Sequence, residues 1–216
     1  MTYLFLFFVP GAAGNFISRC INLLDGGYCW SSDNMIPTNI KDKLNLLSYA
    51  PVMYSTPDHR DWVTDWETKI KHYDNFNRIP PGTKYIVRIN HPNYEILNKN
   101  IAGPDDQQLL VHIDASDNFE WCILNALYKN SYQEINWFKT AKQMLADNNI
   151  YKISLKQIVD NRDTFFEEFK KICDLLNHEL TAVETLAILM LYDQWKTTTL
   201  DYSKFDEFKQ AVGFYM

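Results

Sequence analysis

The stretch Tyr3-Leu-Phe-Leu-Phe-Phe-Val-Pro-Gly-Ala-Ala-Gly-Asn-Phe16 contains the transition from a strand to a helix. Its first half, Tyr3–Val9, is continuously apolar, as expected of a parallel strand that is covered on both faces. After the glycine-containing turn, apolar residues recur with helical spacing as far as about Asp25, and Gly26-Gly27 then ends the predicted helix. A buried strand, a tight turn and a helix form the first βα unit of a parallel sheet.

The rest of the chain continues this alternation. Strands are predicted at 84–89, 108–113 and 150–154, and helices at 118–129, 164–176 and 182–195. Alternating strands and helices predict an α/β fold with three layers, α/β/α, around a central, mainly parallel sheet. The region from Cys29 to Pro80 is polar, aromatic and irregular, with one helical patch at 65–72. No linker or repeat interrupts the chain, so we expect a single domain over 1–216.

Composition and charge argue against several classes of protein. Apolar residues make up 46% of the chain and charged residues 22%, and the formal net charge is −6. This balance is typical of a globular protein and does not favour a general binder of nucleic acid or of anionic membranes. The four cysteines are scattered, so we expect neither a metal site nor a disulfide scaffold. No run approaches the roughly 18 apolar residues of a membrane span, and we expect a cytoplasmic protein.

The turn after the first strand is a candidate anion-binding loop. Small residues at Gly11–Gly14 allow the backbone to bend tightly and to direct several N–H groups into one concavity. The amino terminus of the following helix adds the positive end of its dipole, which suits a phosphate or a sulfate. The spacing matches neither the Walker A motif nor GxGxxG, since no Lys-Ser/Thr pair follows Gly14. The alternative is a tight turn in which the glycines serve geometry alone.

This loop resembles the phosphosulfate-binding loop of sulfotransferases, which typically reads Pro-Lys-Ser-Gly-Thr-Thr. The matching positions are Gly11, Ala12, Ala13, Gly14, Asn15 and Phe16, with Pro10 one place upstream. The resemblance implies a fold like that of the P-loop nucleotide hydrolases. The lysine of the family falls on Gly11 or Ala12 and is absent, and only Asn15 keeps a polar side chain. Arg19 is a candidate substitute cation, with a solvated helix face as its alternative role.

A second segment, Tyr85-Ile-Val-Arg-Ile-Asn-His-Pro92, resembles the sulfotransferase strand that ends in Thr-His-Leu-Pro. The resemblance implies that His91 is the general base for the acceptor hydroxyl, and an imidazole suits this task near neutral pH. Arg88 precedes it on the strand as a candidate ligand-binding residue. The alternative is that His91 merely ends a strand before Pro92.

A third segment, Leu109–Trp121, lies where the family holds the 3′-phosphate of its sulfate donor with an arginine and a serine. Here Ile113 or Asp114 takes the place of the arginine. A run of apolar residues that ends in Asp114 also resembles a Walker B strand, whose aspartate would hold Mg²⁺. Farther on, 149–158 and 165–180 resemble a strand, a turn and a packing helix of the sulfotransferases.

The resemblance implies a sulfotransferase-like enzyme. It would transfer a sulfuryl group from 3′-phosphoadenosine 5′-phosphosulfate (PAPS) to a hydroxyl or amine of a small-molecule or glycan acceptor, with PAP as the product and no metal required. Two alternatives stay open. One is a non-catalytic binding module on the same fold, favoured by the missing cations. The other is a small-molecule kinase or NTPase, for which Asp114 is the argument.

Overall fold

The computed structural model describes residues 1–29, 82–90, 105–128, 135–147, 149–199, 201–206 and 210. Within them the chain forms one five-stranded sheet in the order β2-β3-β1-β4-β5. The strands are β1 (Thr2–Phe7), β2 (Gly27–Cys29), β3 (Tyr85–Asn90), β4 (Gln107–Asp114) and β5 (Tyr151–Ser154). Every pair of neighbours in this sheet is parallel. The predicted α/β fold with a parallel sheet is therefore confirmed.

Strand β1 is the centre of the sheet and the point at which its winding reverses. β1 pairs with β3 on one side and β4 on the other, with Phe7 opposite both Asn90 and His112. After β1 the chain crosses toward β2, whereas after β4 it crosses the other way toward β5. In open α/β sheets, ligands bind at the carboxyl ends of the strands where this reversal occurs. The fold thus places the loop after β1 at this reversal point, next to the carboxyl end of β4.

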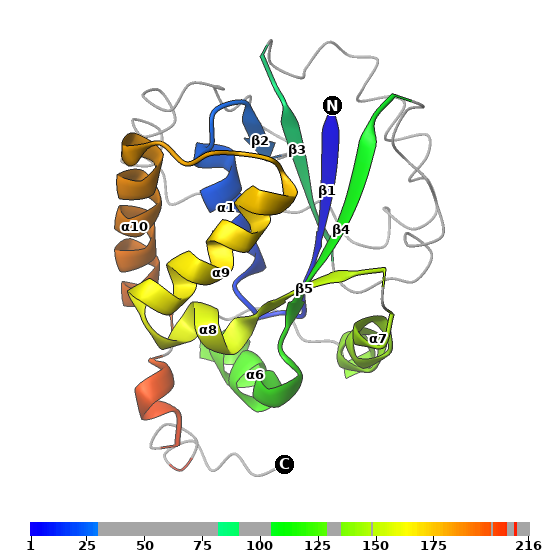
Figure 1. Ribbon diagram of the computed structural model, residues 1–216. Coiled ribbons are helices and arrows are strands. Elements are labelled where there is room, and N and C mark those ends of the chain that lie inside the picture. Colours follow the sequence, from blue (N-terminus) through cyan, green and yellow to red (C-terminus); the bar gives the residue numbers. More distant parts are fainter. Residues whose placement is uncertain are drawn as a thin grey trace.

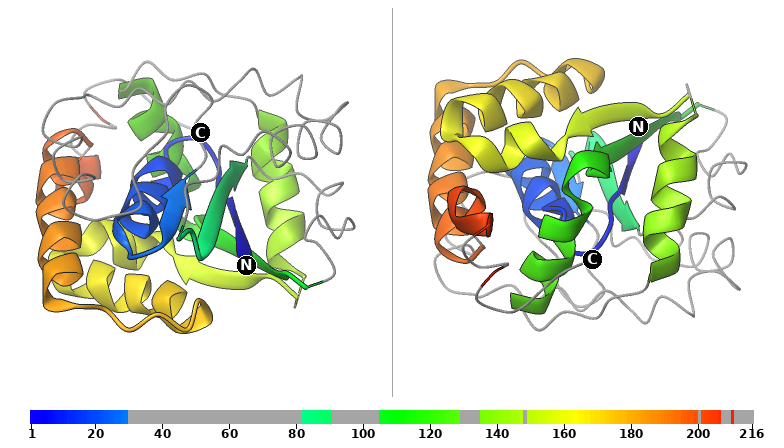
Figure 2. Two further views of the ribbon diagram at one scale, coloured as in Figure 1. Left: turned by 90° about the horizontal axis from the view of Figure 1, so that it is seen from above. Right: turned by 90° about the horizontal axis from the view of Figure 1, so that it is seen from below.

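The helices cover the sheet on both sides (Figures 1 and 2). On one side lie α1, α8, α9 and α10, and α7 lies on the other, while α6 runs below the carboxyl ends of the strands. The bounds are α1 (Gly14–Leu23), α6 (Phe119–Tyr128), α7 (Ile135–Leu145), α8 (Leu155–Asp160), α9 (Arg162–Leu175) and α10 (Ala182–Thr197), with short 3₁₀ turns η1 (Ser116–Asn118) and η2 (Tyr202–Lys204). None of the described helices has both the length and the apolar character needed to cross a bilayer.

An aromatic cluster joins α1 to α9 and α10. The ring of Phe16 stacks on Trp195 with centroids 4.4 Å apart and planes at 10°. Phe165 lies 5.1 Å from Phe16 and stacks on Tyr192 at 4.7 Å. Phe16, Phe165 and Tyr192 are buried, and truncating a buried aromatic residue typically costs about 3–5 kcal/mol. The helix that follows the candidate loop, α1, is therefore held in place by these aromatic contacts with α9 and α10.

Local details differ from the sequence-based expectations. The first strand ends at Phe7, two residues earlier than predicted, because Phe8 and Val9 enter the turn. β2 and α7 were not predicted. The helix predicted at 164–176 begins two residues earlier, at Arg162, because Asn161 caps α9: its Oδ1 accepts the N–H groups of Asp163 and Thr164. The helical patch predicted at 65–72 lies outside the described residues.

Candidate functional site

The loop after β1 has a backbone shape that concentrates N–H groups. Gly11 has φ 84°, and Ala13 lies in the left-handed region with φ 62° and ψ 9°. Such a φ is uncommon for alanine and is a form of strain that is found most often at functional sites. Ala13 is followed directly by the right-handed residues of α1. A left-handed residue next to right-handed ones is the arrangement that turns successive N–H groups toward one anion.

Hydrogen bonds determine which of these N–H groups remain available. The N–H of Ala12 donates to the carbonyl of Val9 at 3.1 Å and closes the turn, so it is used within the loop. The first bond of α1 runs from the N–H of Ile17 to the carbonyl of Ala13 at 3.0 Å. The N–H groups of Gly14, Asn15 and Phe16 precede this bond and therefore have no hydrogen-bond acceptor within the helix, as is usual in the first turn. Together with Ala13 they form the candidate site, which we call the anion loop (Ala13–Phe16).

The electrostatics of the anion loop favour a negatively charged ligand. The first turn of α1 contains no acidic side chain, and the residue that caps it, Ala13, makes no side-chain hydrogen bond to it. The partial positive charge of the helix start is thus not neutralised by a carboxylate of its own first turn. Asn15 is exposed, and Ala13 is partly exposed. A ligand can reach the loop at these residues.

The two glycines are required by packing as well as by conformation. A Cβ on Gly14 would lie 2.0 Å from the ring of Phe8. A Cβ on Gly11 would lie 2.1 Å from the backbone oxygen of Cys122 on α6. The backbone therefore packs closely against the Phe8 ring at Gly14 and against α6 at Gly11, and both close approaches require glycine.

The other residues that the sequence singled out are placed as follows. Phe16 contributes only its N–H to the anion loop, because its ring lies in the aromatic cluster with Trp195. Arg19 lies in the second turn of α1 and is half-buried. Arg88 lies on β3, opposite Phe5 in the register with β1. His91 lies outside the described residues, so its predicted role as a general base stays a prediction.

Asp114 is the last residue of β4, the strand next to β1, and its carboxylate is bound within its own turn. Its Oδ1 accepts the N–H of Ser116 at 3.0 Å and the Ser116 hydroxyl at 2.7 Å. The carboxylate thereby supports the turn into η1, which is a common role for aspartate before a helical turn. No group of three His, Cys, Asp or Glu side chains within the described ranges could hold a metal ion. The observed contacts of Asp114 thus give no support to its reading as a magnesium ligand.

Sequence reasoning missed two polar residues that support the loop, Asn125 and Thr199. The side-chain amide of Asn125 donates to the carbonyl of Gly11 at 2.8 Å, and the hydroxyl of Thr199 donates to Asn125 at 2.9 Å. The available signal was a single asparagine within the apolar run Trp121–Leu127. A buried polar residue in such a run needs partners, but the sequence does not say which.

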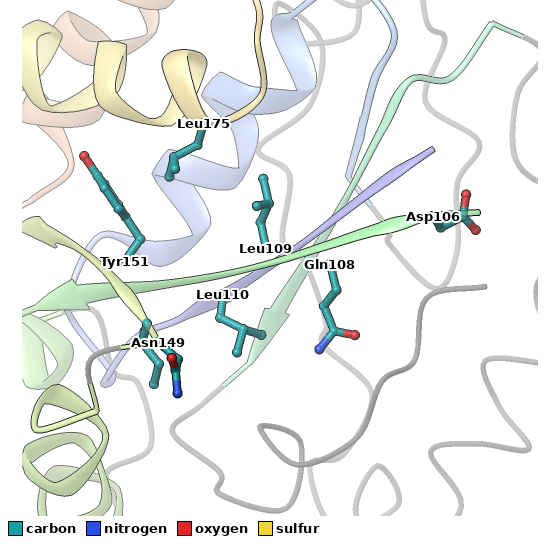
Figure 3. A pocket seen from close by; sticks show the side chains of 8 residues that line it. Asp106, Gln108, Leu109, Leu110, Asn149, Tyr151 and Leu175 are labelled. Atoms are coloured by element: carbon teal, nitrogen blue, oxygen red, sulfur yellow. The ribbon is translucent and has the colours of Figure 1, made fainter. Parts of the chain in front are cut away.

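A separate cavity of about 600 Å³ lies along the first half of β4. Figure 3 shows Leu109 and Leu175 on one side of this strand and Gln108 and Leu110 on the other. Leu109 pairs with Leu4 in the register, whereas the anion loop lies beyond Phe7, at the opposite end of β1. Among the described residues, the lining of the cavity includes one carboxylate, Asp106, and no basic side chain. It is therefore a poor match for a phosphorylated ligand.

His112 is a buried histidine in the middle of the sheet. It is fully buried on β4, and neither ring nitrogen has a hydrogen-bond partner in the described part of the chain. Burial lowers the pKa of His112 from 6.5 to about 4, although the nearby carboxylate of Asp114 opposes this shift. The imidazole is accordingly neutral in the folded protein at neutral pH, and its effect is on stability.

We predict that His112 makes the folded state sensitive to acid. The unfolded chain binds a proton at this residue below about pH 6.5, whereas the folded chain binds it only near pH 4. Protonation of His112 therefore does not reduce the free energy of unfolding above about pH 6.5. As the pH drops to 4, it reduces this free energy by about 3 kcal/mol. Urea unfolding at several pH values measures this slope, and the His112→Leu variant should show a flatter one. An identical slope in the variant would contradict the assignment.

No protein-family model and no curated protein matches the chain. Among solved structures, mouse sulfotransferase SULT7A1 complexed with PAP is similar over 91% of this chain, with 12% sequence identity and a TM-score of 0.44. The chain spans 66% of the length of that structure. The assignment of the fold rests on the strand order and pairing described above, and not on this similarity.

Proposed function

We propose that the anion loop binds the 5′-phosphosulfate end of PAPS and that the chain transfers the sulfuryl group to an acceptor. The observation that carries this proposal is the left-handed Ala13 directly before a helix start without acidic residues, at the reversal point of the sheet. N–H groups that converge on one point recognise the oxygens of a phosphate or a sulfate without a side-chain charge. We infer a small-molecule or glycan acceptor with a hydroxyl or an amine.

In this reaction an acceptor oxygen or nitrogen attacks the sulfur in line with the leaving phosphate. A bond from the acceptor to sulfur forms, the bond from sulfur to the bridging oxygen breaks, and PAP leaves with that electron pair. The N–H groups of Ala13–Phe16 would stabilise the negative charge on the transferred group and the phosphate. His91, by its resemblance to the family's base, would take the proton of the acceptor.

A second function, ligand binding without catalysis, is favoured by two observations. Gly11 and Ala12 leave the loop without the lysine of the sulfotransferases. At the end of β4, the position of the family's arginine falls on Ile113 or on Asp114, an apolar or an acidic residue in place of a basic one. Both differences weaken the binding of a donor with a second phosphate. A module that binds a singly phosphorylated or sulfated ligand would be compatible with them.

The test is a thermal-shift titration of the wild-type protein with PAP, ATP–Mg²⁺ and sulfate. A ligand that binds only the folded state at about 100 times its Kd adds about 2.7 kcal/mol of stability. We expect a shift with PAP and none that depends on Mg²⁺. A shift with sulfate alone would favour the binding module, and one that requires ATP–Mg²⁺ would favour a kinase or NTPase.

A single substitution separates anion binding from general stability. Asn15→Asp adds a carboxylate to the exposed first turn of α1, which should stabilise the ligand-free protein by about 0.3–1 kcal/mol through the helix dipole. The same charge should repel the anion and abolish the shift with PAP. Gln143→Glu on α7 makes the same charge change at an exposed site on the other side of the sheet and should leave the shift intact. A full shift with PAP in Asn15→Asp would contradict the location of the site.

A further inference from the structure

Two hydrogen bonds, one part-buried and one buried, connect the turn before the anion loop to the end of α10. Asn125 lies on α6 and is 1% exposed, and its Nδ2 donates to the carbonyl oxygen of Gly11 at 2.8 Å. Thr199 follows the last residue of α10 by two positions and is 6% exposed. Its Oγ1 donates to Oδ1 of Asn125 at 2.9 Å. The chain thus brings together three segments that are separated by more than 70 residues in sequence.

The first of these bonds controls the orientation of one peptide plane. The carbonyl of Gly11 and the N–H of Ala12 belong to the same planar unit. Asn125 binds its oxygen, and the carbonyl of Val9 accepts its N–H at 3.1 Å. Because both polar ends are held, the plane cannot rotate without losing a hydrogen bond. The direction in which the chain enters Ala13, and so the direction of the following N–H groups, depends on this plane.

The second bond determines how Asn125 is oriented. A carbonyl oxygen only accepts, so Gly11 requires the NH₂ end of the asparagine amide. The oxygen end then faces away from the loop into a buried site, where it needs a donor. The hydroxyl of Thr199 is that donor. Without it, the oxygen of Asn125 would be left without this partner, and the orientation that serves Gly11 would lose its support.

The end of α10 also reaches the other side of the loop. The ring of Trp195, in the last turn of α10, stacks on Phe16 at 4.4 Å. Phe16 supplies the last N–H of the anion loop. One short segment, Trp195–Thr199, therefore makes two supporting contacts. It supports Gly11, in the turn before the anion loop, through Asn125, and it supports Phe16, the last residue of the anion loop, directly.

We propose that Asn125 and Thr199 are positioning residues that keep the anion loop in its binding shape. This inference rests on the proposed function, because it assumes that Ala13–Phe16 bind an anion. Neither residue touches the ligand. The hydroxyl of Thr199 acts through the amide of Asn125 on the peptide of Gly11, and its loss lowers the affinity for the anion in addition to any loss of stability.

The experiment compares the full-length wild type with Thr199→Val, which keeps the shape of the side chain and removes its hydroxyl. Calorimetry with sulfate and with PAP, well below the melting temperature of every variant, measures affinity in folded protein. We expect about a 10-fold weaker Kd in Thr199→Val, which corresponds to the loss of one buried hydrogen bond. Thr199→Ser restores the hydroxyl and should bind within two-fold of the wild type. Thr197→Val removes an exposed hydroxyl that donates to the carbonyl of Gln194, and it should also be neutral.

The outcomes separate this inference from the proposed function. An unchanged Kd in Thr199→Val with reduced stability would mean a structural role only and would overturn the inference. If the wild type binds neither anion, the proposed function fails, and amide hydrogen exchange in the ligand-free protein decides the positioning role. Exchange at Ala12, whose N–H donates to the carbonyl of Val9, should then be at least several-fold faster in Thr199→Val than in the wild type, and equal rates would overturn the inference. Should Thr199→Val not fold, the smaller Thr199→Ala variant takes its place in both measurements.

Discussion

Gly11→Ala is expected to lose at least about 3 kcal/mol of unfolding free energy. The residue has φ 84°, and a Cβ would lie 2.1 Å from the carbonyl oxygen of Cys122 and 2.9 Å from its carbon. Both contacts are with backbone, which cannot rotate away as a side chain would. The loop and α6 would have to separate, and the hydrogen bond from Asn125 to Gly11 would be lost with them. Strain and a broken buried contact together place this substitution among the most damaging single changes.

Gly82→Ala is the matched control. Gly82 has φ 83°, nearly the same as Gly11, but a Cβ there would meet no atom of the described residues within 4 Å. It should cost only about 1 kcal/mol, from the left-handed conformation alone. Urea unfolding of the two variants separates the conformational penalty from the close approach to α6. Equal losses in both variants would show that the contact with Cys122 does not constrain the loop.

Glu184→Ala is expected to have an effect of similar size at the opposite end of the sheet. Glu184 is 2% exposed, and its carboxylate accepts the N–H of Asp25 at 2.6 Å and both the N–H and the hydroxyl of Thr181 at 2.8 Å. The Nε2 atom of His178 lies 3.0 Å from it. Removing the carboxylate takes the acceptor from two backbone N–H groups and one hydroxyl in part-buried hydrogen bonds, and it breaks the capping box of α10. We predict a loss of about 3–5 kcal/mol.

Chemical unfolding of Glu184→Ala beside Glu167→Ala tests this prediction. Glu167 is exposed on α9 and pairs with Lys170 on the surface, so its loss should cost less than about 1 kcal/mol. Glu184→Gln keeps the volume and should be intermediate, because its NH₂ group would face a backbone donor. A loss below 1 kcal/mol in Glu184→Ala would mean that water replaces the carboxylate without difficulty.

The contacts of Glu184 form a chain of the kind that occurs in active sites, but their environment indicates a structural role. The Nδ1 atom of His178 lies 3.2 Å from the hydroxyl of Tyr85, so a carboxylate, an imidazole and a phenol lie in line. Burial opposes the charge on Glu184, but the N–H groups of Thr181 and Asp25 outweigh it, and the pKa of Glu184 is lowered. Burial also raises the pKa of Tyr85 above its usual value of 10, so the reactive phenolate is even less populated near neutral pH. These hydrogen bonds therefore connect α10 to Asp25, just after α1, and to Tyr85 on β3.

The sequence predicted the fold where the signals are local. The apolar run Tyr3–Val9, followed by a glycine turn and a helical pattern, identified β1 and α1 because strand burial and helix periodicity are visible within a few residues. β2 was missed because it has three residues, Gly27–Cys29, and depends on pairing with β3 from a distant segment. Asn161 and Asp163 are both good capping residues. Only the extended backbone of Asn161 shows which of them begins α9.

The candidate site was predictable in position but not in detail. The sequence does not distinguish the backbone N–H groups of Gly11–Phe16. In the structure, the N–H of Ala12 donates a hydrogen bond within the turn, and the ring of Phe16 is buried in the core. Asn125 and Thr199 could not be identified because their contacts with the loop are tertiary. Nothing in the sequence distinguishes the two isolated histidines His112 and His178. The fold gives His178 two hydrogen-bonding neighbours and leaves His112 without one among the described residues.

The most direct test of the anion loop is a ¹⁵N–¹H correlation spectrum recorded during a titration with PAP. The account predicts that the amide resonances of Ala13, Gly14, Asn15 and Phe16 shift together and saturate with one Kd. The amide of Ala12, which donates to Val9, should move less. Saturable shifts confined to residues elsewhere, or no shift at millimolar PAP, would contradict the assignment of this loop as the binding site.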